Sequence, residues 1–142
     1  MIFVYKFLTL FLYPLFIFII YVRKIFGKED SIRFKEKIFL SSIQVSRVKS
    51  KKLIWFHAAS IGEIQSIKNL IEYYHKNGYE ILITTVTKTA AQLVKDKILK
   101  NDLMHHRYFP IDVTFLIRKF LNTWSPNLII FVDSEIWPNL MT

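Results

Sequence analysis

Four short strand-like runs alternate with three segments of helical periodicity, and this alternation constrains the fold more than any other feature. The expected strands are residues 53–58, 80–85, 107–109 and 128–132, and the expected helices are residues 62–76, a segment beginning near Lys88, and residues 115–124. Apolar strands that alternate with helices are typical of a parallel sheet covered on both faces. The predicted fold class is therefore α/β.

The strand order indicates where a ligand would bind. In the usual doubly wound order, 3-2-1-4, the first and fourth strands are neighbours and the winding reverses between them. Ligands bind at the carboxyl ends of the strands at such a point. The turn after the first strand carries Glu63 and the turn after the fourth carries Glu135. We therefore expect these two carboxylates to face one crevice.

Two interpretations of Glu63 are open at this stage. A carboxylate in the first turn of a helix is stabilised by the helix dipole, so a capping role explains Glu63 fully. The functional alternative is a general base that takes a proton from a hydroxyl nucleophile, with Glu135 orienting the acceptor or modulating the base. Ser60 and Gly62 present donors at the start of the same helix, which suits an anionic group of a ligand.

Threonines cluster at the end of the second strand, in the run TTVTKT at residues 84–89. Thr84, Thr85 and Thr87 are candidate acceptor-binding hydroxyls, although helix capping explains one or two of them. His57 is expected to be a core histidine satisfied by a hydrogen bond. The side chains of the adjacent pair at 105–106 should point apart on a strand. The sequence suggests no metal site and contains neither GxGxxG nor GxxxxGK[ST].

Residues 1–22 are predicted to form a membrane anchor helix. Residues 7–22 carry no charge, and Lys6 lies near enough to the end to snorkel. Pro14 is expected to kink this helix without breaking it. Arg23 and Lys24 follow directly, which favours a cytoplasmic location for the rest of the chain. A spanning helix and a helix lying among the headgroups both remain open.

The net charge of +9 is concentrated behind the apolar segment. Residues 23–52 hold ten Lys or Arg against three acidic residues, whereas residues 53–142 hold nine against eight. We interpret 23–52 as a basic membrane-proximal collar, which anionic headgroups attract. A solvated flank without a specific lipid is the alternative. Basic residues are not interleaved with aromatic ones in the folded part, so no nucleic-acid partner is expected.

Several blocks in chain order resemble the 3-deoxy-D-manno-octulosonic acid (Kdo) transferases of lipopolysaccharide synthesis. After the apolar start and the collar sequence RFKEK at 33–37 come WFHAASIGE at 55–63, TTVTKT at 84–89, YFPID at 108–112 and DSEIWPNL at 133–140. The resemblance implies that residues 53–142 form the N-terminal Rossmann-like acceptor domain of a GT-B glycosyltransferase, preceded by a membrane helix.

The family's reaction moves Kdo from CMP-Kdo to a lipid A precursor at the cytoplasmic face of the inner membrane, with inversion and without a catalytic metal or cofactor. By this resemblance Glu63 matches the catalytic base and Glu135 the second functional glutamate. Asp133 and Ala90 depart from the more usual Glu and Gly. The family's donor domain is absent from these 142 residues, so we expect the family function of the parent gene product and no transfer by this segment alone. The alternative is a non-catalytic, membrane-tethered module that binds an acidic lipid.

Overall fold

The computed structural model describes residues 2–42, 47, 50–132 and 137–141. The chain forms two compact units, and each unit is assembled from segments that are not contiguous in the sequence. Unit 1 comprises Met1–Gln44, Pro110–Thr123 and Ile136–Thr142, and unit 2 comprises Val45–Phe109 and Trp124–Glu135. Each unit is described by itself.

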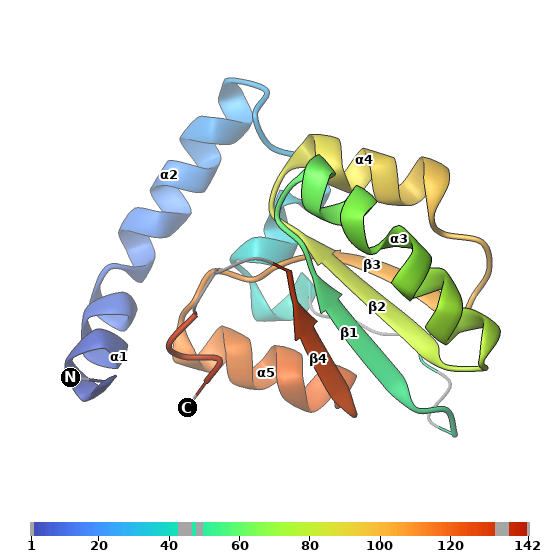
Figure 1. Ribbon diagram of the computed structural model, residues 1–142. Helices are drawn as coiled ribbons and strands as arrows, with labels where there is room; N and C mark the ends of the chain where they lie inside the picture. Colours follow the sequence, from blue (N-terminus) through green and yellow to red (C-terminus); the bar gives the residue numbers. More distant parts are fainter. Residues whose placement is uncertain (1, 43–46, 48–49, 133–136, 142) are drawn as a thin grey trace. The chain divides into compact units, whose positions relative to one another are not determined.

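Unit 2 is built on a four-stranded parallel sheet (Figure 1). Its strands are β1 (Leu53–His57), β2 (Glu80–Thr85), β3 (Met104–Tyr108) and β4 (Leu128–Phe131). They lie in the order β3-β2-β1-β4, and every neighbouring pair is parallel. This arrangement confirms the predicted strand order, in which β1 and β4 are neighbours.

Helices α3 (Ile61–Lys76) and α4 (Lys88–Lys97) cover one face of the sheet (Figure 1). Their apolar residues recur at three and four positions, so each helix presents one apolar stripe to the strands. Gly78 follows α3 in the left-handed conformation with φ +84°, as its position predicts. The buried residues of this core are Ile54, Phe56, Ala58, Ile64, Ile67, Ile71, Ile81, Ile83, Val94, Ile98 and Met104.

The opposite face of the two central strands is buried as well. Trp55 and His57 of β1 are fully buried on that side. Trp124 ends helix α5 (Thr114–Trp124), and its ring centroid lies 5.3 Å from that of His105. Both faces of β1 and β2 are therefore covered, which agrees with the expectation for a parallel sheet.

The predicted start of β3 was wrong. The prediction placed this strand at residues 107–109, before Pro110, whereas the strand runs from Met104 to Tyr108. Among the described strands β3 pairs with β2 alone, so it forms one edge of the sheet and its side chains alternate between buried and partly exposed. His105 and His106 accordingly point to opposite faces, as expected. An edge strand tolerates polar residues that a central strand would exclude.

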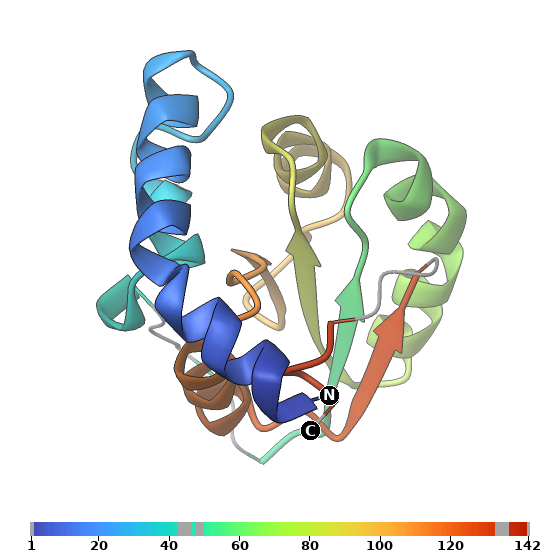
Figure 2. The same ribbon diagram turned by 90° about the vertical axis from the view of Figure 1, so that its left-hand side faces the viewer.

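The prediction of one continuous helix over residues 1–22 was also wrong, although the expected bend near Pro14 is present. Unit 1 begins with α1 (Ile2–Phe11) and α2 (Tyr13–Ile25), whose axes differ by 54° (Figure 2). Pro14 stands in the first turn of α2, where its missing N–H is not needed, and its ring blocks the carbonyl of Leu10 as a helical acceptor. Neither helix is long and apolar enough to cross a membrane by itself, whereas the bent pair meets the requirements of length and composition.

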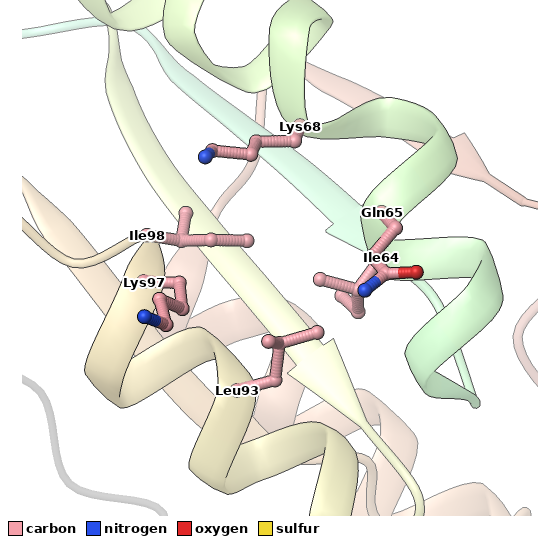
Figure 3. A pocket seen from close by; sticks show the side chains of 6 residues that line it. All are labelled: Ile64, Gln65, Lys68, Leu93, Lys97 and Ile98. Atoms are coloured by element: carbon pink, nitrogen blue, oxygen red, sulfur yellow. The ribbon is translucent and has the colours of Figure 1, made fainter.

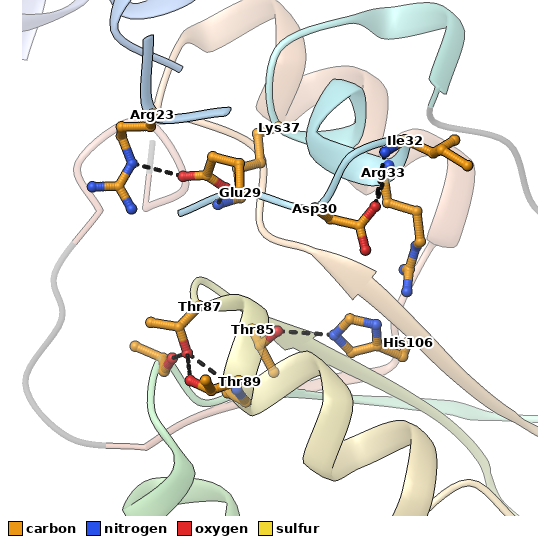
Figure 4. Close-up of polar contacts among 12 residues, drawn as sticks. Arg23, Glu29, Asp30, Ile32, Arg33, Lys37, Thr85, Thr87, Thr89 and His106 are labelled. Atoms are coloured by element: carbon orange, nitrogen blue, oxygen red, sulfur yellow. Dashed lines mark hydrogen bonds and ion pairs between the residues drawn. The ribbon is translucent and has the colours of Figure 1, made fainter. Parts of the chain in front are cut away.

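Part of the basic collar is committed to ion pairs inside unit 1. Arg23 Nε lies 2.7 Å from Glu29 (Figure 4), and Arg33 Nε lies 2.7 Å from Glu36 in the 3-10 helix η1 (Arg33–Lys37). Lys37 also bonds to Glu29, and burial lowers its pKa. Fewer of these charges are therefore available to lipid headgroups than the formal count suggests.

One further collar residue stabilises unit 2. Arg47 donates from Nε to the buried carboxylate of Glu80 at 3.1 Å, and its guanidinium also bonds to the carbonyl of Trp124. His105 Nε2 lies 2.8 Å from the other oxygen of Glu80. Glu80 is thus a buried carboxylate with two nitrogen partners, which offset its desolvation.

Candidate active site

Glu63 lies in the first turn of α3, just after the connection from β1. Ser60 is the N-cap of α3, and its Oγ accepts from the backbone N–H of Glu63 at 3.4 Å. In return, Glu63 Oε1 accepts from the Ser60 hydroxyl at 2.6 Å, and Oε2 accepts from the N–H of Ala59 at 2.7 Å. This reciprocal arrangement is a variant of the capping box, because the carboxylate accepts from the N–H of Ala59 and the hydroxyl of Ser60 and not from the N–H of the N-cap residue. The structural interpretation of Glu63 is therefore correct as far as it goes.

The capping contacts leave part of the hydrogen-bonding capacity of the Glu63 carboxylate unused. Each of its oxygens has two lone pairs, and one hydrogen bond is assigned to each oxygen. Glu63 is partly exposed, so a further donor can approach it from solvent. The two bonds hold the side chain in one orientation, which is the pre-organisation that a general base requires.

The turn after β2 lies against the turn after β1. Thr87 is the N-cap of α4: its Oγ1 accepts from the N–H of Ala90 at 3.2 Å (Figure 4) and donates to the carbonyl of Ala59 at 3.4 Å. The first turns of α3 and α4 therefore open at the same edge of the sheet. Helix N-termini carry partial positive charge, so this edge suits an anion.

Gly62 lies in the first turn of α3 and is exposed. A Cβ added there would meet nothing within 4 Å, and its φ is not in the left-handed region. The fold of the described residues does not require glycine here. Its place at the exposed start of α3 leaves the backbone open to close approach by another molecule.

Thr84 and Thr85 are placed differently from the expectation. Both side chains are fully buried. The Thr84 hydroxyl lies 2.8 Å from both Trp55 Nε1 and His57 Nδ1, and the Thr85 hydroxyl lies 2.9 Å from His106 Nε2 (Figure 4). This burial gives both hydroxyls core side chains as partners, whereas their contact with an acceptor stays a prediction. It also confirms His57 as a core histidine with a hydrogen bond.

Glu135 and Asp133 lie outside the described residues, so the crevice shared by Glu63 and Glu135 stays a prediction. The described residues just before Asp133 lie next to β1. Phe131 pairs with His57, and the N–H of Val132 donates to the His57 carbonyl at 2.9 Å. The last described residue before Asp133 therefore lies beside the carboxyl end of β1.

Asp112 and Asn139 form a polar cluster that the sequence analysis did not single out. In unit 1, Asp112 Oδ2 accepts from the Tyr5 hydroxyl at 2.8 Å and from the Asn139 N–H at 3.1 Å. The Asn139 side-chain amide donates to the Asp112 carbonyl at 2.6 Å and to Thr9 at 3.3 Å. Burial raises the pKa of Asp112. Both residues stand in blocks that carry the family resemblance, and that was the available signal.

A hollow of about 230 Å³ lies between α3 and α4, with Lys68 and Lys97 on opposite helices (Figure 3). Its other lining residues are Ile64, Gln65, Leu93 and Ile98. No carboxylate or hydroxyl group lines it, so we assign it no part in a transfer reaction. Among the described residues, no three His, Cys, Asp or Glu side chains are grouped so as to hold a metal ion.

Residues 32–142 match a protein family described as 3-deoxy-D-manno-octulosonic-acid transferase (kdotransferase). The chain belongs to the Kdo transferase family. A Kdo transferase of Rickettsia bellii is 38% identical over 136 residues, which cover 94% of this chain and 31% of that protein. A probable mitochondrial Kdo transferase of Arabidopsis thaliana is 38% identical over 91 residues, covering 63% of this chain and 20% of that protein.

A bifunctional glycosyltransferase/methyltransferase of Fusobacterium nucleatum is 31% identical over 111 residues, covering 75% of this chain and 17% of that protein. The chain thus spans about a third or less of the length of these three relatives. The family assignment and the observed parallel sheet agree with the N-terminal Rossmann-like domain of a GT-B Kdo transferase.

Proposed function

We propose that this chain supplies the acceptor-side domain for transfer of Kdo from CMP-Kdo to a lipid A precursor. The observation that carries the proposal is the Glu63 carboxylate, held in one orientation by Ala59 and Ser60 where the first turns of α3 and α4 meet. The family to which the chain belongs supports the choice of donor and acceptor.

In this mechanism, Glu63 takes the proton from the attacking hydroxyl of the acceptor. The hydroxyl oxygen forms a bond to the anomeric carbon of Kdo as the bond from that carbon to the phosphate oxygen of CMP breaks. CMP leaves with the bonding electron pair, the anomeric centre inverts, and the proton stays on Glu63 until solvent removes it. The N-termini of α3 and α4 favour negative charge, which supports a reaction without a catalytic metal.

We assign the contacts with the acceptor to the accessible groups in the turns after β1 and β2. Gly62 offers exposed backbone, Thr87 offers an exposed hydroxyl, and Ser60 orients the base. Thr84 and Thr85 act indirectly, by fixing the side chains behind the turns. Glu135 remains the proposed second carboxylate. Most contacts to CMP-Kdo are assigned to a second Rossmann-like domain of the family.

We also propose that the domain works at the cytoplasmic face of the inner membrane. Helices α1 and α2 expose large apolar side chains, including Phe3 at 81% and Phe11 at 74%. Arg23 and Lys24 in the last turn of α2 favour the cytoplasmic side. The Rickettsia bellii relative is a bacterial Kdo transferase.

The test is a chimera in which this chain replaces the segment of the Rickettsia bellii transferase that it matches. Incubated with CMP-Kdo and a lipid A precursor, the chimera is expected to yield a product heavier by one or more Kdo units, detected by mass spectrometry. Residues 1–142 alone are expected to yield none. A folded chimera that binds the precursor but transfers nothing would instead favour the non-catalytic lipid-binding module.

A further inference from the structure

A groove of about 350 Å³ lies between α1 and α5 within unit 1. Its apolar lining consists of three residues on one face of α1 and one residue of α5: Phe3, Phe7, Leu10 and Phe115. The volume is at the small end of the range found for ligand pockets. The groove is large enough for one slender apolar group and too small for several.

Two cations line the same groove from opposite helices. Lys6 comes from α1 and Arg118 from α5. Within the part of the chain that the structure describes, neither has a carboxylate partner, whereas Arg23, Arg33 and Lys37 do. Apolar walls beside two uncompensated cations fit an anion that carries a long apolar tail.

Hydrogen bonds hold α1 in place beside this groove. Tyr5 and Thr9 are one turn apart, and they bond to Asp112 and Asn139. Asn139 also accepts from Thr114, the first residue of α5. The same polar cluster therefore connects the two helices that line the groove. Phe3 and Phe7 nevertheless remain 81% and 66% exposed, so their apolar surface is still available to another molecule.

We propose that this groove binds one anionic bilayer phospholipid, with an acyl chain along Phe7 and Phe115 and its phosphate at Lys6 and Arg118. The occupant is a bilayer phospholipid and not the acceptor, because a lipid A precursor carries several acyl chains and the groove has room for one. Glu63 is not among the residues that line the groove, and the bound phospholipid fixes α1 and α5 against the membrane surface.

The experiment uses the whole chain in nanodiscs of phosphatidylglycerol and phosphatidylcholine, released for native mass spectrometry. The wild-type chain is expected to retain one phosphatidylglycerol. The double substitution Lys6→Gln and Arg118→Gln is expected to lower the retained fraction roughly tenfold, since each cation near the surface contributes to phosphate binding. The matched control, Lys28→Gln with Lys119→Gln, removes the same net charge from exposed positions and should retain the lipid.

Equal loss in the control pair, or no loss in the Lys6 and Arg118 pair, would overturn the proposal. A second measurement needs no variant: phosphatidylglycerol with a photoreactive acyl chain should cross-link to the α1 and α5 residues of the groove. Cross-links confined to other segments would contradict it. Displacement of phosphatidylglycerol by an equimolar lipid A precursor would make the acceptor the occupant.

The test of phospholipid binding and the test of Kdo transfer can fail independently of each other. Glu63→Gln should leave phosphatidylglycerol bound to the chain, because Glu63 does not line the groove. A chimera that transfers no Kdo would therefore contradict the proposed function but not the phospholipid site. Loss of phosphatidylglycerol in the control pair as well as in the Lys6 and Arg118 pair would contradict the phospholipid site but not the proposed function.

Discussion

At the scale of single residues, Ser60 and Glu63 stabilise each other across the first turn of α3. Ser60→Ala removes the N-cap oxygen and one donor to the carboxylate. We expect the free energy of unfolding to fall by about 0.5–2 kcal/mol, measured by urea titration in detergent. Asn69→Ala, at an exposed site in the same helix, is the control and should change it by less than about 0.5 kcal/mol.

Thr84→Val tests whether this threonine serves the core or a ligand. Valine fits the space but leaves Trp55 Nε1 and His57 Nδ1 without the hydroxyl. We expect destabilisation of about 1–3 kcal/mol in thermal or chemical unfolding, because buried polar atoms lose their partner. Unchanged stability together with weakened acceptor binding would restore the original expectation that Thr84 contacts the acceptor.

Asp112 gives unit 1 a dependence on pH. Burial raises its pKa above the ordinary value of 3.8, although bonds from Asn139 and Tyr5 oppose the shift. The folded state therefore holds the proton more tightly than the unfolded state does. The resulting stability is fully present below the ordinary pKa and is lost as the pH rises through the raised one.

Substituting Asp112→Asn removes this titration while keeping an oxygen to accept from Tyr5 and Asn139. Denaturant titrations between pH 3 and pH 7 should therefore show a smaller loss of stability with rising pH in the variant than in the wild-type chain. Parallel pH profiles for the two proteins would show that Asp112 does not titrate as described.

At the scale of elements, the sequence predicted the helices and strands that have a clear periodicity or an apolar run. The limits of β2 and the start of α4 at Lys88 agree with the structure, because buried apolar strands and amphipathic helices leave clear patterns. The start of β3 was missed because an edge strand needs no apolar run. The break after Phe11 was missed because the effect of Pro14 was judged by its tolerance in membrane helices.

Helix α1 depends on Asn139 for part of its attachment to unit 1. Asn139→Ala removes the bond to Thr9 and leaves the Thr114 hydroxyl without its acceptor. Amides of α1 should then exchange with deuterium faster, whereas amides of β2 keep their protection. Asn69→Ala serves again as the matched substitution and should leave α1 unchanged. Equal exchange in all three proteins would mean that Asn139 does not hold α1.

At the scale of the whole molecule, the ordered blocks were enough to identify the Kdo transferase family, which residues 32–142 confirm. The geometry of the Glu63 turn was predictable in outline, since a serine three residues before a glutamate favours a capping box. The burial of Thr84 and Thr85 was not, because the partners of a hydroxyl on a central strand come from neighbouring strands. The groove between α1 and α5 likewise joins residues more than a hundred positions apart.

The central claim is that Glu63 acts as a base and is more than a cap. Glu63→Gln in the chimera separates the two roles, because glutamine keeps an oxygen for the Ala59 N–H but cannot take a proton. The turnover number for Kdo transfer should fall by roughly 10²–10⁴-fold, while acceptor binding and the unfolding midpoint stay close to those of the unsubstituted chimera. Turnover within about threefold of the unsubstituted chimera would contradict the claim, since losing a general base costs far more.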